Sequence, residues 1–93
     1  MYYVKRPVPV MAVKIPEDFN EDWLHREAPG WLVNAFANGE IKDNSNHLII
    51  NTLEGPMICK YGYWIIKGVR GELYGCRTDV FEETYEPYRG ESK

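Results

Sequence analysis

Cations and aromatic rings alternate closely between residues 60 and 81, and this pattern could bind a nucleotide. Guanidinium and ammonium groups pair with phosphate, an aromatic ring stacks on a base, and a glycine-rich turn lets a backbone amide approach an oxygen atom. We therefore predict a ligand-binding site in this stretch. Its predicted members are Lys67, Arg70 and Arg77 to hold phosphates, Trp64 or Tyr74 to stack a base, and Tyr63 beside them.

The same cations also have an ordinary structural interpretation. Lys67 and Arg70 could pair with Glu72 or Glu54 across neighbouring strands on a solvated sheet face. Such cross-strand ion pairs are common in antiparallel sheets. Both interpretations stay open from the sequence.

The chain carries no recognisable catalytic motif. A nucleophile elbow, a Walker loop, a GxGxxG turn, zinc-ligand spacing and an HExxH pair are all missing from the sequence. The two histidines, His25 and His47, fall on a charged helix face and in a polar turn, where surface positions are expected. We predict no catalytic residue, no metal site and no cofactor, although a pair of carboxylates brought together only by folding stays open.

The net charge and the amino-acid composition limit the kinds of partner that this protein is expected to bind. The net charge of −3 argues against general nucleic-acid binding, which requires a basic surface. Aromatic residues make up 14% of the 93 residues, more than so small a core needs, so an interface and a homo-oligomer are expected. Cys59 and Cys76 lack metal-ligand spacing and are predicted to be buried free thiols, with a disulfide only in a secreted chain. Neither a signal peptide nor a membrane span is expected.

The first half of the chain reads as a strand followed by helix. Residues 2–15 are predicted to form a strand, at a sheet edge or with a bend, because Pro7 and Pro9 cannot donate to a neighbouring strand. Residues 16–39 are predicted to be helical in two pieces. Asn20 caps the first piece, Pro29 breaks it and opens the second, and Gly39 ends the second. One apolar stripe, predicted to face the core, is Trp31, Leu32, Ala35 and Phe36.

The second half reads as short antiparallel strands. They are predicted at 48–53, 57–60, 64–66 and 72–76, with a turn at 54–56 and Trp64-Ile65-Ile66 the most buried. Asp79 is predicted to cap a helical turn at 80–83, and Tyr85 is a candidate start of a final strand. The predicted fold is α+β: an N-terminal strand, a short bent helix or helical hairpin, then a curled antiparallel meander of four or five strands in a small roll or partly open barrel. Residues 1–88 are expected to be one compact domain and residues 89–93 a frayed tail.

One long motif resembles a known group of proteins. It comprises Trp64-Ile65-Ile66-Lys67-Gly68-Val69-Arg70-Gly71-Glu72-Leu73-Tyr74, then Cys76-Arg77, Asp79-Val80-Phe81 and Thr84-Tyr85-Glu86. With Thr52 to Gly55, Pro29 to Leu32 and Lys5 to Val8, it is similar to a widespread family of small bacteriophage and prophage proteins, mostly uncharacterised. The chain departs from that family at Tyr61-Gly62-Tyr63, where relatives carry Pro-Gly-Asp, and at Gly75 and Thr78, where they carry proline. The resemblance implies a phage origin, a location in the host bacterial cytoplasm and an accessory role.

These observations lead to three hypotheses of function. The first is a non-enzymatic, phage-encoded binding protein that counteracts host antiviral defence by sequestering a nucleotide immune signal. The second is a protein–protein inhibitor of a host defence enzyme or other host machinery, which the surplus of aromatic residues favours. The third, ranked lowest, is a small nucleotide-processing enzyme.

Overall fold

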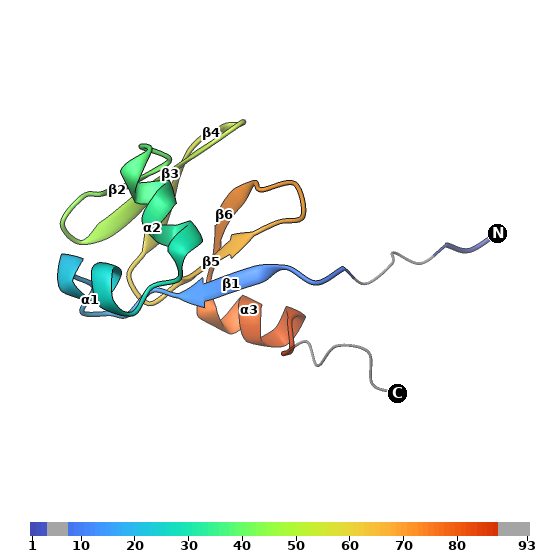
Figure 1. The fold of residues 1–93 in the computed structure, drawn as a ribbon. Coiled ribbons are helices and arrows are strands. Elements are labelled where there is room, and N and C mark those ends of the chain that lie inside the picture. Colours follow the sequence, from blue (N-terminus) through green and yellow to red (C-terminus); the bar gives the residue numbers. More distant parts are fainter. Residues whose placement is uncertain (4–7, 88–93) are drawn as a thin grey trace.

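The computed structural model describes residues 1–3 and 8–87, which form two small antiparallel sheets and three short helices (Figure 1). The predicted α+β class is confirmed, and the sheets are not closed into a barrel. The elements in chain order are β1 (Met11–Lys14), α1 (Glu21–Arg26), α2 (Gly30–Ala37), β2 (Ile41–Asp43), β3 (His47–Thr52), β4 (Gly55–Lys60), β5 (Trp64–Lys67), β6 (Leu73–Cys76) and α3 (Thr78–Thr84). One sheet has the strand order β1-β5-β6 and the other β2-β3-β4.

The first strand is shorter than predicted. β1 begins at Met11 and pairs with β5, whereas the predicted strand began at residue 2. Pro9 would stand opposite Val69 in this register and has no N–H to donate, so the pairing ends at Met11. β1 is an edge strand, as the prolines predicted. The part of the prediction over residues 4–7 and the predicted tail at 89–93 lie outside the described residues.

Local signals divide the helical segment as expected. The Asn20 side chain accepts a hydrogen bond of 2.8 Å from the Trp23 N–H and caps α1. Pro29 separates the two helices but occupies the N-cap of α2 rather than its first helical position. Gly39 has φ of +84° and ends α2. Glu40 N–H then donates to Ala35 C=O, at 2.9 Å.

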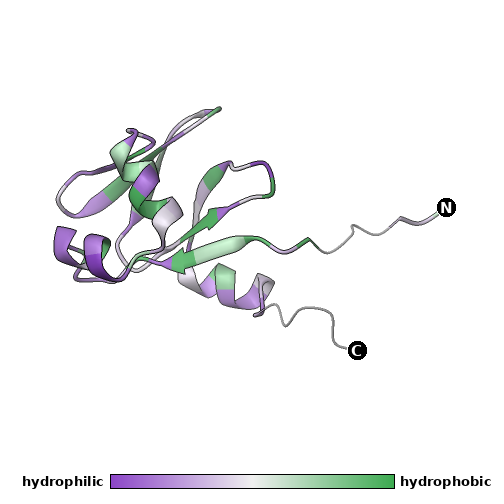
Figure 2. Ribbon diagram, viewed as in Figure 1, coloured by the Kyte–Doolittle hydropathy of each residue, from purple (hydrophilic) through white to green (hydrophobic). Residues whose placement is uncertain are grey.

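The core lies between the two sheets and the first two helices. The apolar stripe of α2 faces it, with Leu32 and Ala35 buried and the two rings of the stripe packed around them. Figure 2 shows hydrophobic colours on α2 and on strands of both sheets, while α1 is mostly hydrophilic. β6 approaches β4 closely, because a Cβ on Gly75 would lie 3.2 Å from Cys59 Sγ. The other buried core residues include Ile15, Ile41, Leu48, Ile50 and Ile65.

α3 covers the opposite face of the β1-β5-β6 sheet. Its Phe81 ring stacks on Trp64, and Ile66 is fully buried on the same side of β5. The helix begins one residue earlier than its predicted cap, because Arg77 occupies the N-cap and Asp79 lies inside the first turn. Tyr85 is the C-cap of α3, so the expected final strand at this residue was wrong.

The β3–β4 hairpin is tighter than predicted. Thr52 stands opposite Gly55, so that the turn consists of Leu53 and Glu54. Pro56 therefore belongs to β4, where we had predicted a turn. Its position alternates with the residues of β4 that bond to β3, so its missing N–H disrupts no pairing.

Candidate functional site

The two rings expected to stack a base are engaged within the protein. Trp64 lies against Phe81 with ring centroids 3.9 Å apart and planes 8° from parallel. Tyr74 lies opposite Ile66, so it shares the sheet face that α3 covers. Partial burial and a hydrogen bond with Tyr85 raise the pKa of Tyr74 to about 12. Phe81 thus already covers one face of the Trp64 ring, where a base would have to stack.

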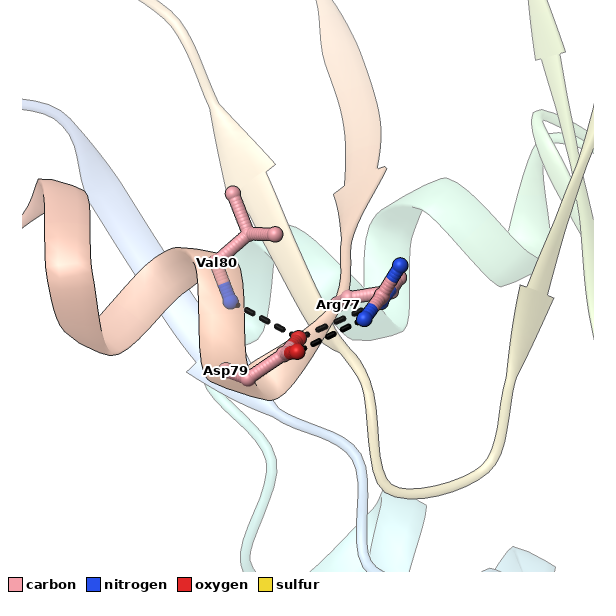
Figure 3. A network of polar contacts seen from close by, with 3 residues as sticks. All are labelled: Arg77, Asp79 and Val80. Atoms are coloured by element: carbon pink, nitrogen blue, oxygen red, sulfur yellow. Dashed lines mark hydrogen bonds and ion pairs between the residues drawn. The ribbon is translucent and has the colours of Figure 1, made fainter.

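Arg77 is also engaged. Its guanidinium donates from Nε to Asp79 Oδ1 at 3.1 Å and from Nη2 to Asp79 Oδ2 at 2.6 Å (Figure 3). Asp79 Oδ1 further accepts the Val80 N–H at 2.9 Å. These contacts lower the pKa of Asp79 and raise that of Arg77. A phosphate that bound Arg77 would have to compete with this carboxylate.

Lys67 and Arg70 occupy different parts of the β5–β6 hairpin. Lys67 ends β5 on the face opposite to Trp64, because the two side chains are three residues apart on one strand. Arg70 lies in the turn, and its backbone N–H donates to Glu72 Oε1 at 3.0 Å. Among the described residues the ion pairs are Arg26–Asp22 and Arg77–Asp79. The predicted pairing of Lys67 or Arg70 with Glu72 or Glu54 is therefore not formed.

Two of the six predicted residues, Arg70 and Tyr74, line one groove. It has a volume of about 740 Å³ and lies between the β3–β4 hairpin and the turn from β5 to β6. The polar side chains of its wall include a single guanidinium and three carboxylates, and its apolar members include Leu53, Met57 and Leu73. The carboxylates are Glu40, Glu54 and Glu72. A groove with this charge repels an anion more than it attracts one.

The remaining predicted residues lie elsewhere. Tyr63 is half-buried and packs against the core, and neither it nor Lys67 lines the groove. Trp64 Nε1 is buried without a hydrogen-bond partner in the described part of the chain. The structure thus distributes the six residues over both faces of one sheet, a turn and a helix N-terminus.

A second surface, which the sequence analysis did not identify, is the outer face of the β2-β3-β4 sheet. Its centre is the cross-strand pair Ile49–Ile58, and Ile58 is 62% exposed. His47 and Lys60 form the next pair on this face, and Lys42 stands opposite Ile49. We call these residues, with Asn51 and Pro56, the outer sheet face.

The outer sheet face combines an apolar centre with a basic rim. None of the residues that the three strands place on it is acidic, because Asp43 pairs with Leu48 on the core side. A hollow of about 610 Å³ at its edge is lined by His47, Ile58 and Lys60 together with Glu17 and Tyr61. The signal for this surface was the period of two in residues 56–60, which places Ile58 opposite in parity to the buried Cys59.

Both cysteines are free, and the pKa of each thiol is raised, chiefly by burial. Cys59 is buried, and burial raises the pKa of its thiol to about 12, so the thiolate is not formed near neutral pH. Cys76 is also free but only half-buried, contrary to the predicted burial of both. Over residues 1–3 and 8–87 no three His, Cys, Asp or Glu side chains are placed to hold a metal ion. No helix in the same residues combines the length and the apolar character that crossing a membrane requires.

No protein-family model, curated protein or solved structure matches this chain.

Proposed function

We propose that this chain is a non-enzymatic binding protein that acts on another protein through its outer sheet face. The exposure of Ile58 beside Ile49 is the observation that carries this proposal. An aliphatic centre with a basic rim suits a protein surface with an apolar patch and carboxylates around it. The resemblance to small phage proteins supports a phage origin, action in the host bacterial cytoplasm and a role against host defence.

The geometry favours a protein over a nucleotide as the partner. Trp64 is stacked on Phe81, and Arg77 is paired with Asp79. The groove that contains Arg70 carries three carboxylates in its wall. On the outer sheet face, by contrast, the strands contribute cations and no carboxylate, and the hollow at its edge contains one carboxylate, Glu17.

Capture from the lysate of a host bacterium tests the proposal. Tagged protein is compared with the variants Ile58→Asp and Val69→Asp. Val69 is a matched control, because it is 65% exposed but lies in the β5–β6 turn. We expect one captured protein to be retained by Val69→Asp and lost from Ile58→Asp, and the same substitution to abolish protection of an infecting phage. Equal capture by both variants, or no capture by the native chain, would contradict the proposal.

A nucleotide immune signal is the second candidate ligand. Arg70 and Tyr74 support it, because a guanidinium and an aromatic residue line one groove of about 740 Å³. Calorimetric titration with cyclic and ADP-ribose-type nucleotides tests it, with Arg77→Ala as the control for Arg70→Ala. Binding that Arg70→Ala removes and Arg77→Ala keeps would establish this candidate, and no heat across the panel would eliminate it.

A further inference from the structure

β1 has a free outer edge. It is the first strand of the β1-β5-β6 sheet, and no strand of the described residues pairs with its other side (Figure 1). Ile15 N–H donates to Tyr63 C=O at 2.8 Å, in register with the β1–β5 pairing. The backbone groups of a strand point alternately to its two sides, so the odd-numbered residues of β1 bond to β5. The N–H and C=O groups of Ala12 and Lys14 therefore point outward, and Val10 has the same parity.

The prolines before β1 leave this outer edge intact. Pro9 stands at an odd position, where it ends the pairing with β5. Each even-numbered residue from Val8 to Lys14 carries an N–H. A protected edge commonly places proline where its missing N–H faces outward. In this chain the missing N–H of Pro9 faces β5 instead, and the outer side of the strand keeps its donors.

The other sheet edges are blocked or short. The Asn51 N–H donates to the Glu40 C=O, so the odd-numbered residues of β3 bond to β2 and its even-numbered residues bond to β4. The backbone groups of the even-numbered residues of β4 therefore point outward, and one of these residues is Pro56, which has no N–H. On β6 the outward N–H of Gly75 donates to Met57 Sδ at 3.2 Å. β2 has only three residues. Within the described residues β1 is thus the edge with an unbroken row of donors and acceptors.

We propose that β1 pairs with β1 of a second copy of this chain, antiparallel and about a two-fold axis that passes beside Ala12. In this register Ala12 pairs with its own counterpart and Val10 pairs with Lys14. These are the outward-facing residues, so each pair can exchange two N–H···O=C bonds. The two β1-β5-β6 sheets then form one continuous sheet across the dimer.

The side chains of β1 are complementary to themselves in this register. Met11, which is 54% exposed, lies opposite Val13 of the second copy on the core side of the sheet. On the α3 side Ala12 meets Ala12, where only a small side chain fits between two covered faces. Lys14 meets Val10 and not another lysine, so the pairing brings no like charges together. This match is why the occupant is a second copy rather than an unrelated strand.

The contact is small, so the dimer should be weak. Residues 10–14 of two strands bury much less than the roughly 800 Å² per partner of a standard interface. We expect a dissociation constant on the order of 10 to 100 µM. The outer sheet face lies on the other sheet, so the dimer does not depend on the proposed protein partner.

Sedimentation equilibrium of the full chain from about 1 µM to 1 mM tests the proposal, since this range brackets the expected dissociation constant. The native chain should pass from monomer to dimer in this range. Ala12→Pro removes one outward donor without breaking a bond to β5, so it should weaken the dimer at least tenfold while circular dichroism and melting stay native. Ala12→Ser, which keeps both the N–H and a small side chain, is the control and should dimerise. A native chain that stays monomeric at 1 mM overturns the proposal, and so does an Ala12→Pro variant that dimerises normally.

A charge exchange tests the register itself. Val10→Lys places one lysine opposite each Lys14, which creates two like-charged pairs, one on each side of the two-fold axis, and should weaken the dimer about tenfold. Adding Lys14→Glu to this variant creates two Lys–Glu pairs and should restore native affinity or exceed it. Lys14→Glu alone should have little effect, because Val10 stands opposite. Failure of the double variant to recover relative to Val10→Lys would exclude this register.

Discussion

Trp64 on β5 and Phe81 on α3 stack with 3.9 Å between their ring centroids and 8° between their planes. This contact packs α3 against the face of the β1-β5-β6 sheet that is opposite to the core. Phe81 in turn stacks on Tyr85, with centroids 4.9 Å apart. The prominent aromatic residues at the end of the chain thus form one column that holds the last helix in place.

We expect Phe81→Ala to destabilise the protein by about 2 kcal/mol. A fully buried phenylalanine loses ~3–5 kcal/mol on truncation, and Phe81 is only half-buried. Val80→Ala is the matched control on the same helix, since Val80 is exposed and should change the free energy of unfolding by less than about 0.5 kcal/mol. Urea denaturation measures both, and equal losses would mean that the Trp64 stack does not anchor α3.

Two glycines, one at the start of α2 and one just after its end, should respond oppositely to alanine. Gly39 has φ of +84°, which alanine adopts with strain, so Gly39→Ala should destabilise by about 1 kcal/mol. Gly30 begins the helix with negative φ, and a Cβ there meets no atom within 4 Å. Gly30→Ala should stabilise by about 0.5 kcal/mol, because alanine lowers the entropy of the unfolded chain. Thermal unfolding of the two variants gives the comparison, and a loss at Gly30 as large as at Gly39 would refute it.

Cys59 should make the fold sensitive to alkali. Its pKa rises from 9.0 to about 12 on folding, so the folded state favours the neutral thiol. As the pH rises, the thiol ionises in the unfolded state before it ionises in the folded state. The stabilisation that the neutral buried thiol provides is therefore complete below pH 9 and is lost between pH 9 and 12. The loss is at most about 1.4 kcal/mol per pH unit from this group.

Cys59→Ala removes the ionising group and supplies the comparison for Cys59. Its stability should fall less steeply than that of the native chain as pH rises above 9. Urea denaturation from pH 8 to pH 11 measures the two slopes. Parallel slopes would show that ionisation of Cys59 is not linked to folding.

The Arg77–Asp79 pair should be visible in the titration of the carboxyl group. The guanidinium lowers the pKa of Asp79 below its usual value of 3.8. In an Arg77→Gln variant that pKa should rise toward the usual value, because the principal hydrogen bonds to the carboxylate are weakened. Carboxyl carbon NMR between pH 2 and 6 follows the group, and an unchanged midpoint would indicate that the pair does not persist in solution.

The boundaries of the helices could be predicted from single residues. Asn20, Pro29 and Gly39 act on the backbone immediately around them, so their effect does not depend on the rest of the fold. The placement of Trp64 and Lys67 on opposite faces of β5 could also be predicted, because residues three apart on a strand point to opposite sides. The start of β1 could not be predicted, since Pro9 ends the pairing only because the register turns its missing N–H toward β5.

The sequence alone determined the α+β class, the division of the helical segment and the buried character of Ile65 and Ile66, because each depends on local conformation or on the period of apolar residues. Only the tertiary structure decided which side chains meet. It paired Arg77 with Asp79, stacked Trp64 on Phe81, and left Ile58 and the outer edge of β1 uncovered. The physical reason is that a contact requires two elements to pack at one place, and the spacing of residues along a chain does not specify how elements distant in sequence pack together.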